Sequence, residues 1–141
     1  MQSNIARTDE EITSCFNVMV ELRPHLTPES FVARVKRQMA DGYRLAYLAD
    51  AGKVVCCAGF RILENLAWGR FLYVDDLVTV KERQGAGFGS TMLQWLIEEA
   101  KRQGCAEFHL DSGTWRTEAH SFYFKHKMVI KSFHFSLPLK G

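Results

Sequence analysis

Three glycines occupy alternate positions directly before an amphipathic helical pattern, in the stretch RQGAGFGSTMLQWL of residues 83–96. A glycine inside a helix or strand costs stability, so this cluster indicates a loop that turns sharply or approaches a ligand closely. At a helix N-terminus, unpaired N–H groups and the positive end of the helix dipole attract anions, and missing Cβ atoms leave room for a phosphate. Gly85, Gly87 and Gly89 therefore predict an anion-binding turn. The alternative is a plain strand-to-helix turn, for which one glycine would suffice.

The hydrophobic periodicity predicts a mixed α/β domain around this turn. A capping box at Thr8–Glu11 and a proline directly after Thr27 mark the starts of two helices, and Gly104 fits the end of the helix that follows the glycines. Strands are expected at residues 3–7, 43–50, 53–63, 70–80, 106–111 and 129–139, and a short helix at 117–126. Residues 70–111 would then form a strand–loop–helix–strand unit with a right-handed parallel crossover.

Composition limits the classes of function. The chain has 141 residues, 47% hydrophobic and 24% charged, which are values for one globular domain. A net charge of +2 is too small to indicate nucleic acid or a membrane surface as a partner. No apolar run is long enough to span a membrane, and the N-terminus lacks the apolar core of a signal peptide. The cysteine usage described next leads us to expect the cytoplasm as the compartment.

The cysteine and histidine spacings do not indicate a metal site. The four cysteines show no C-x-x-C spacing, and the five histidines show no H-x-x-x-H pair. The cysteines are expected to be small buried side chains in a reducing compartment.

Two nucleotide-binding motifs do not fit the glycine stretch. A P-loop would need a lysine after its last glycine, and none is present. The dinucleotide fingerprint has the spacing G-x-G-x-x-G in the first strand–helix turn, whereas the spacing here is G-x-G-x-G in a late one.

A different family fits. The run from Gln84 to Gly89 matches the Q/R-x-x-G-x-G/A motif of the GNAT superfamily of acyl-CoA N-acyltransferases, and DDLVTVKERQGAGFG resembles that family's fourth strand and pyrophosphate loop. The stretch AHSFYFKHKM resembles its later helix, written N-x-x-A-x-x-F-Y-x-x-x-G-F, with Ala119, Phe122 and Tyr123 in register. The asparagine of that pattern falls on Arg116 and its Gly-Phe pair on Lys127-Met128.

The resemblance implies a fold and a co-substrate. The fold is a mixed, mostly antiparallel central sheet with one parallel βαβ unit and helices on both faces, in a single domain over residues 1–141. The co-substrate is acetyl-CoA, whose pantetheine arm would pair with the strand backbone and whose pyrophosphate would lie on the loop. The residues implied are Leu77, Val78 and Thr79 for the arm and Gln84, Gly85, Ala86, Gly87, Phe88, Gly89 and Ser90 for the pyrophosphate.

The resemblance also implies two catalytic side chains. Tyr123 aligns with a tyrosine that protonates the leaving thiolate, the alternative being a core aromatic. Asp75 matches an acidic position that holds or deprotonates the amine, the alternative being a salt bridge. Asp76 is expected on the opposite face of the strand, because consecutive strand residues alternate. His120 is a reserve base.

The expected reaction is transfer of an acetyl group to a primary amine by direct attack on the thioester. A small-molecule amine is favoured over a protein, and Trp68, Phe71 and Tyr73 either line its pocket or belong to the core. The resemblance also allows a homodimer through the C-terminal strand. Two alternatives stay open: a non-catalytic acyl-CoA-binding sensor and a nucleotide-binding module.

Overall fold

The structure is a computed structural model that describes residues 2–140. The chain forms two compact units, residues 1–109 and 110–141, each with its own internal packing. The first unit contains β1 (Asn4–Ile5), α1 (Asp9–Ser14), α2 (Phe16–Leu22), α3 (Pro28–Met39), β2 (Arg44–Asp50), β3 (Lys53–Asn65), β4 (Gly69–Thr79), the 3₁₀ turn η1 (Lys81–Arg83) and α4 (Phe88–Arg102). The strand β5 (Glu107–Leu110) lies at the boundary, and α5 (Thr117–Lys125) belongs to the second unit.

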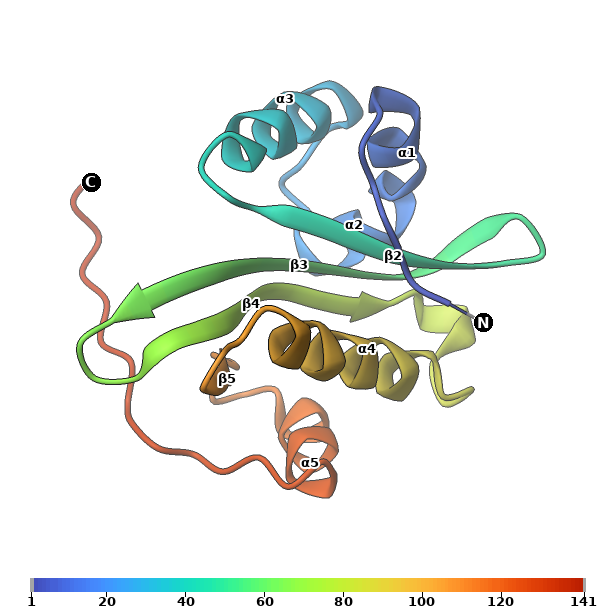
Figure 1. Cartoon of the computed structure of the whole chain (residues 1–141). Coiled ribbons are helices and arrows are strands. Elements are labelled where there is room, and N and C mark those ends of the chain that lie inside the picture. Colours follow the sequence, from blue (N-terminus) through green and yellow to red (C-terminus); the bar gives the residue numbers. More distant parts are fainter. Residues whose placement is uncertain (1, 141) are drawn as a thin grey trace. The chain divides into compact units, whose positions relative to one another are not determined.

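The five strands form one sheet in the order β1-β2-β3-β4-β5. The first three pairs are antiparallel, and β4 and β5 form the one parallel pair. The predicted hairpin of β2 and β3 and the predicted crossover from β4 through α4 to β5 are therefore present (Figure 1). The mixed, mostly antiparallel sheet is confirmed.

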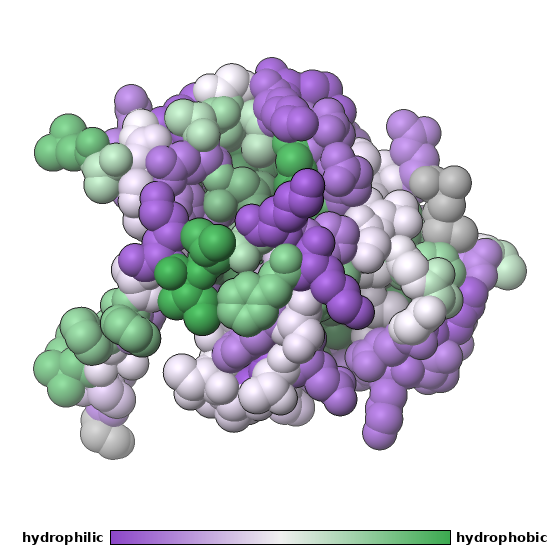
Figure 2. All heavy atoms as spheres, turned by 90° about the horizontal axis from the view of Figure 1, so that it is seen from below, coloured by the Kyte–Doolittle hydropathy of each residue, from purple (hydrophilic) through white to green (hydrophobic). Residues whose placement is uncertain are grey.

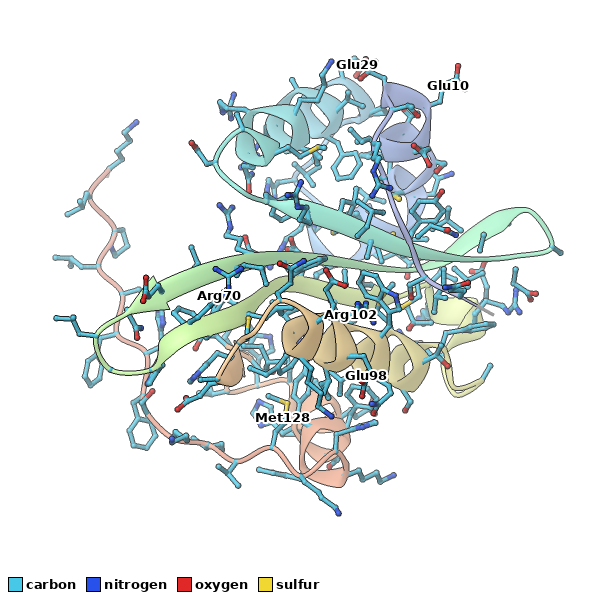
Figure 3. The ribbon with its side chains drawn as sticks, viewed as in Figure 1. Glu10, Glu29, Arg70, Glu98, Arg102 and Met128 are labelled. Carbon is cyan, nitrogen blue, oxygen red and sulfur yellow. The ribbon has the colours of Figure 1, made fainter. Side chains whose placement is uncertain are left out.

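Helices cover both faces of the sheet in the first unit (Figure 1). The helix α2 packs on β3 and β4 from one face, with α1 and α3 beside it, and α4 packs on β2, β3 and β4 from the other face. Both predicted helix starts are confirmed, because Thr8 and Thr27 each accept a hydrogen bond from the third helical N–H and form capping boxes. Glu10 and Glu29 project away from the sheet (Figure 3).

The hydrophobic core lies between the sheet and these helices. Its largest fully buried side chains include Met19 of α2, Leu48 and Leu72 of the sheet, and Leu93 and Leu96 of α4. Each such side chain contributes about 1.5–3 kcal/mol through burial, and Leu72 anchors β4 in this core. No helix within residues 2–140 is long and apolar enough to cross a membrane.

Two predictions of secondary structure were wrong. The first predicted helix is two helices, α1 and α2, with a break at Cys15. The predicted strand at 129–139 is not formed, and its apolar side chains are exposed (Figure 2). The alternation of apolar and polar residues shows that a segment can present one apolar face. A strand also needs a neighbouring strand for its backbone hydrogen bonds. The exposed residues are Val129, Ile130, Phe133, Phe135, Leu137 and Leu139.

Candidate active site

The glycine loop joins β4 to α4 through η1, and its backbone explains two of the three glycines. Gly85 has φ = 86° and Gly87 has φ = 91°, a left-handed conformation that residues with a side chain rarely adopt. A Cβ at either position would meet nothing within 4 Å, so the protein itself does not fill this space. Gly89 lies inside α4 and needs no such conformation. The loop therefore has bare backbone beside open space, as an anion site requires.

The N-terminus of α4 supplies the donors. Gly87 is its N-cap, without a side-chain capping hydrogen bond, and the N–H of Thr91 donates to the Gly87 carbonyl at 3.0 Å. The N–H groups of the first turn, which include those of Phe88 and Gly89, therefore have no acceptor within the helix. The dipole of this 15-residue helix adds positive potential at the same place. The donor set fits a pyrophosphate.

Side chains at the edge of the loop brace it. The guanidinium of Arg83 forms an ion pair with Asp50 and lies 5.0 Å from the ring centroid of Phe88. Gln84 donates from its side-chain amide to the carbonyl of Thr79 at 3.2 Å. Both side chains are thus engaged within the protein, so the backbone remains the main source of donors.

The last residues of β4 pair with a strand on one side. Leu77, Val78 and Thr79 stand opposite Ala58, Cys57 and Cys56 of β3. On the other side, β5 has 4 residues against 11 in β4. The N–H of Ala106, just before β5, donates to the carbonyl of Arg70 near the start of β4, at 2.7 Å. In the sheet as described, β5 therefore ends before it reaches residues 77–79.

A β-bulge lies in the middle of β4. Gly59 of β3 pairs with Asp76 and the next residue, Phe60, pairs with Val74, so Asp75 is the extra residue. A bulge interrupts the alternation of side chains and re-aims them. Asp75 and Asp76 consequently line one pocket on the α1–α3 side of the sheet. The prediction that they face opposite sides was wrong, because it assumed a regular strand.

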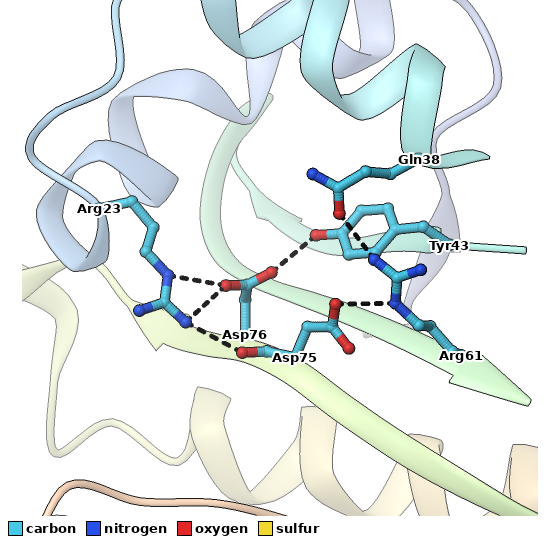
Figure 4. Close-up of polar contacts among 6 residues, drawn as sticks. All are labelled: Arg23, Gln38, Tyr43, Arg61, Asp75 and Asp76. Atoms are coloured by element: carbon cyan, nitrogen blue, oxygen red, sulfur yellow. Dashed lines mark hydrogen bonds and ion pairs between the residues drawn. The ribbon is translucent and has the colours of Figure 1, made fainter. Parts of the chain in front are cut away.

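Asp75 forms an ion pair in this pocket. Its Oδ2 accepts a hydrogen bond from Nε of Arg61 at 2.9 Å, and the same guanidinium donates to Gln38 at 2.7 Å (Figure 4). Burial raises the pKa of Asp75, while the Arg61 guanidinium lowers it and limits the rise. Within residues 2–140, the structure shows no hydrogen bond to the second carboxylate oxygen of Asp75, so this oxygen can accept one from a ligand.

Asp76 is held from two sides. Nε of Arg23 donates to its Oδ1 at 2.9 Å, and the hydroxyl of Tyr43 donates to its Oδ2 at 2.8 Å (Figure 4). Arg23 also donates to the backbone carbonyl of Asp75 at 3.0 Å. Burial and the nearby Asp76 carboxylate raise the pKa of Tyr43 well above its usual value. Tyr43 therefore stays protonated, and Asp76 has a structural role in fixing the bulge.

These residues surround a cavity of about 650 Å³, a volume typical of small-molecule sites. It lies between α2, α3, β3 and β4. Its lining residues are Met19, Arg23, His25, Leu26, Phe31, Arg34, Val35, Gln38, Tyr43, Arg61, Leu63, Tyr73, Asp75 and Asp76.

Only one of the three aromatic residues proposed for an acceptor pocket lines this cavity, namely Tyr73. Trp68 stacks on His109 with ring centroids 3.7 Å apart, and Phe71 is buried with its ring edge-on to Trp68 at 5.1 Å. For Trp68 and Phe71 the packing interpretation fits the contacts.

The remaining candidates, Tyr123 and His120, lie on α5 in the second unit. Burial raises the pKa of Tyr123, and the Arg116 guanidinium opposes this rise. Its ring packs edge-on to Phe122 at 5.4 Å. Nε2 of His120 lies 2.8 Å from the carbonyl of Gly113, an acceptor, so this nitrogen carries a proton and donates it. That bond leaves only Nδ1 of His120 to act as a base.

Four residues of the site were not predicted from the sequence, namely Arg23, Gln38, Tyr43 and Arg61. A signal existed for Arg61, because a charged residue interrupts the apolar run KVVCCAGFRIL of β3. A buried charge needs a partner, and the consecutive aspartates of the neighbouring strand were the obvious choice. Arg23, Gln38 and Tyr43 come from segments whose contact with β4 has no sequence signature.

Known proteins resemble this chain in sequence and in fold. A family model described as "Acetyltransferase (GNAT) family" matches residues 7–128. An uncharacterized N-acetyltransferase of Bacillus subtilis (strain 168), YhdJ, is 28% identical over 132 residues, which cover 92% of this chain and 93% of that protein. A solved protein of Agrobacterium tumefaciens str. C58, described as an acetyltransferase, superposes with a TM-score of 0.85 at 23% identity and covers 98% of this chain and 99% of its own.

A second solved structure contains a ligand. It is AAC(6')-Iy in complex with the bisubstrate analogue CoA-S-monomethyl-acetylneamine, with a TM-score of 0.84 at 10% identity and full coverage of both chains. At such identity the likeness shows the fold alone. The family match, which extends over most of the chain, shows more: the chain belongs to the acetyltransferase (GNAT) family. The family and the enzyme class expected from the glycine motif are thereby confirmed.

Proposed function

We propose that this protein transfers an acetyl group from acetyl-CoA to a primary amine by direct attack of the amine on the thioester. The observation that carries the proposal is the construction of β4. Its bulge presents Asp75 to a small-molecule cavity, and its C-terminal end leads directly into the bare backbone loop of Gly85 and Gly87. The candidate amine site lies on β4, and the candidate anion site lies in the loop that follows this strand and η1.

The loop and strand fit CoA in two ways. The positive-φ glycines and the N-terminus of α4 offer N–H donors for a pyrophosphate, which supports the proposed contacts of residues 84–90. The backbone of Leu77 to Thr79 lies beyond the reach of β5, which supports its pairing with an extended ligand such as the pantetheine arm.

Asp75 serves the amine. An alkyl amine with a pKa near ~10.4 is almost fully protonated at neutral pH, so only about one molecule in 10³ can attack. A carboxylate beside it holds the cation and accepts its proton through water. The free oxygen of Asp75 suits this role, whereas both oxygens of Asp76 are occupied by Arg23 and Tyr43.

Tyr123 serves the leaving group. A departing thiolate resembles a cysteine thiolate with a pKa near ~8.5, and a tyrosine with a pKa near ~10 can protonate it. Burial raises the pKa of Tyr123 further, so the proton is in place at neutral pH. This role rests on the motif spacing around Tyr123, and His120 has the weaker case because its Nε2 donates to a backbone carbonyl.

Three wider properties complete the proposal. The family model matches residues of both compact units, which supports one acetyltransferase domain over residues 1–141. The free cysteines, three of them buried, support the cytoplasm as the compartment. The exposed apolar side chains of the C-terminal segment support a homodimer in which that segment is covered.

Amine-dependent release of CoA tests the reaction. Purified protein is mixed with acetyl-CoA and a panel of primary amines, and free thiol is measured over time. Turnover that depends on the amine supports the enzyme. Tight CoA binding without release under any amine would support the alternative, an acyl-CoA sensor, and tighter binding of NAD or ATP than of CoA would support a nucleotide-binding module.

A further inference from the structure

The cavity of the first unit has one more positive than negative charge. Its lining contains three guanidinium groups, of Arg23, Arg34 and Arg61, and two carboxylates, of Asp75 and Asp76. Arg23 pairs with Asp76 and Arg61 pairs with Asp75, each at 2.9 Å. Arg34 is left over. Within residues 2–140, its side chain has no ion pair or hydrogen bond, and the residue is exposed to solvent.

Arg34 lies at the exposed edge of the cavity-facing stripe of α3. Phe31, Arg34, Val35 and Gln38 follow one another at spacings of three and four residues, so they lie on one stripe of the helix, and all four line the cavity. Phe31 and Val35 are buried, and Gln38 contacts Arg61. The guanidinium of Arg34 is thus unpaired and exposed at the edge of the cavity, where a ligand could reach it.

We propose that the amine accepted here also carries an anionic oxygen group, a carboxylate or a phosphate, and that Arg34 binds it. The inference rests on the proposed function, because it assigns the ammonium of the substrate to Asp75. A guanidinium binds either anion through two parallel hydrogen bonds, so Arg34 suits both. The anionic end of such a ligand would pair with the Arg34 guanidinium while its ammonium lies at Asp75, and about 650 Å³ accommodates a small ligand.

The test compares matched substrates and one substitution. The substrates are ω-amino carboxylates with their primary amides, and ω-aminoalkyl phosphates with their parent alcohols, so that within each pair only the anionic group is lost. The variant is Arg34→Gln. Arg37→Gln is the control, because Arg37 belongs to the same helix and is exposed but does not line the cavity. Turnover is measured as CoA release, and affinity is measured separately by calorimetry.

The wild type should use at least one anionic series better than its uncharged partners. Arg34→Gln should lower kcat/KM for that series roughly tenfold, mainly through KM, because a hydrogen bond to a charged group is lost. The same substitution should leave kcat/KM for the uncharged amines nearly unchanged. Arg37→Gln should change kcat/KM for neither class of substrate. The anionic series whose kcat/KM falls further in Arg34→Gln identifies the anion as carboxylate or phosphate. Added salt should weaken the preference, since Arg34 is exposed.

The two possible failures are distinguishable. If calorimetry shows an affinity for anionic amines that Arg34→Gln removes, but no amine releases CoA, the inference stands and the proposed reaction falls. If uncharged amines react as well as anionic ones, and Arg34→Gln alters neither turnover nor affinity, the reaction stands and the inference is overturned.

Discussion

The hydroxyl of Tyr43 donates a hydrogen bond to Oδ2 of Asp76 at 2.8 Å, and it reaches that carboxylate across a residue without a side chain, Gly59. A Cβ at Gly59 would lie 1.8 Å from the Tyr43 hydroxyl. Since Gly59 also pairs with Asp76 across the bulge, the ring of Tyr43, the glycine and the aspartate form one packed unit. This unit fixes the strand that carries Asp75.

Gly59→Ala should therefore destabilise the protein by about 1–3 kcal/mol, the usual cost of overpacking. Denaturant unfolding measures this change. In a Tyr43→Ala background the same substitution should cost much less, because the clashing ring is gone. Equal costs in both backgrounds would show that Tyr43 does not lie over Gly59.

The glycine loop makes a prediction about CoA. Gly87→Asp should abolish the rise in Tm that we expect acetyl-CoA to produce, because it places a side chain and a negative charge at the proposed pyrophosphate site. It also strains a backbone with φ = 91°. Gly104→Asp is the matched control, since Gly104 follows the other end of α4 with φ = 72° and open space at its Cβ position. Normal CoA binding by the Gly87→Asp protein would place the pyrophosphate elsewhere.

Asp75 and Asp76 should respond differently to loss of charge. Asp75→Asn should lower kcat/KM at every pH at which Asp75 of the wild type is ionised, because the amine loses its counter-charge and proton acceptor. Asp76→Asn should mainly lower the unfolding free energy, by about 1 kcal/mol, since it weakens the contacts to Arg23 and Tyr43. Steady-state kinetics and unfolding on the same two variants compare them. A catalytic defect confined to Asp76→Asn would show that the amine binds at Asp76 and not at Asp75.

The pH profile should carry the signature of Asp75 and its partner. On the alkaline side kcat/KM should rise toward the pKa of the amine. On the acid side it should fall as Asp75 is protonated, at a pH above the ordinary aspartate pKa of about 3.9, because burial raises this pKa. The Arg61 guanidinium lowers the pKa of Asp75, so Arg61→Gln should move the acid limb to higher pH. A limb that stays in place, or moves to lower pH, would show that another group titrates there.

Tyr123→Phe should leave acetyl-CoA affinity nearly intact and lower kcat by roughly 10²-fold, because the hydroxyl matters as the thiolate forms. Single-turnover kinetics should accompany the assay, so that chemistry is known to limit the rate. An unchanged single-turnover rate would show that Tyr123 does not act as the acid and only packs beside Phe122.

The fold could be predicted where local signals act alone. Thr8 and Thr27 have the side chains that cap helices, and the hairpin, the crossover and the end of α4 followed from periodicity and glycine positions. The C-terminal segment could not be predicted, because alternation of Phe133, Phe135 and Leu137 specifies an apolar face and not its partner.

The candidate site, like the fold, could be predicted only where single residues or short motifs carry a signal. The loop glycines and the two consecutive aspartates carry a signal in their residue types, and the resemblance to the GNAT superfamily singled out Asp75 as a candidate. The bulge could not, because it arises from the pairing of two strands, in which Gly59 stands opposite Asp76 and Asp75 is the extra residue. The partners Arg23, Tyr43 and Arg61 follow from that register and from the placement of α2 and β2.

The most direct test of the central claim is CoA release with wild-type and Asp75→Asn proteins, measured together with product mass. We predict thiol release that requires a primary amine, an acetylated amine formed in equal amount, and a strongly reduced rate in the variant at unchanged CoA affinity. CoA binding with no amine-dependent release, or equal rates for wild type and variant, would contradict the account.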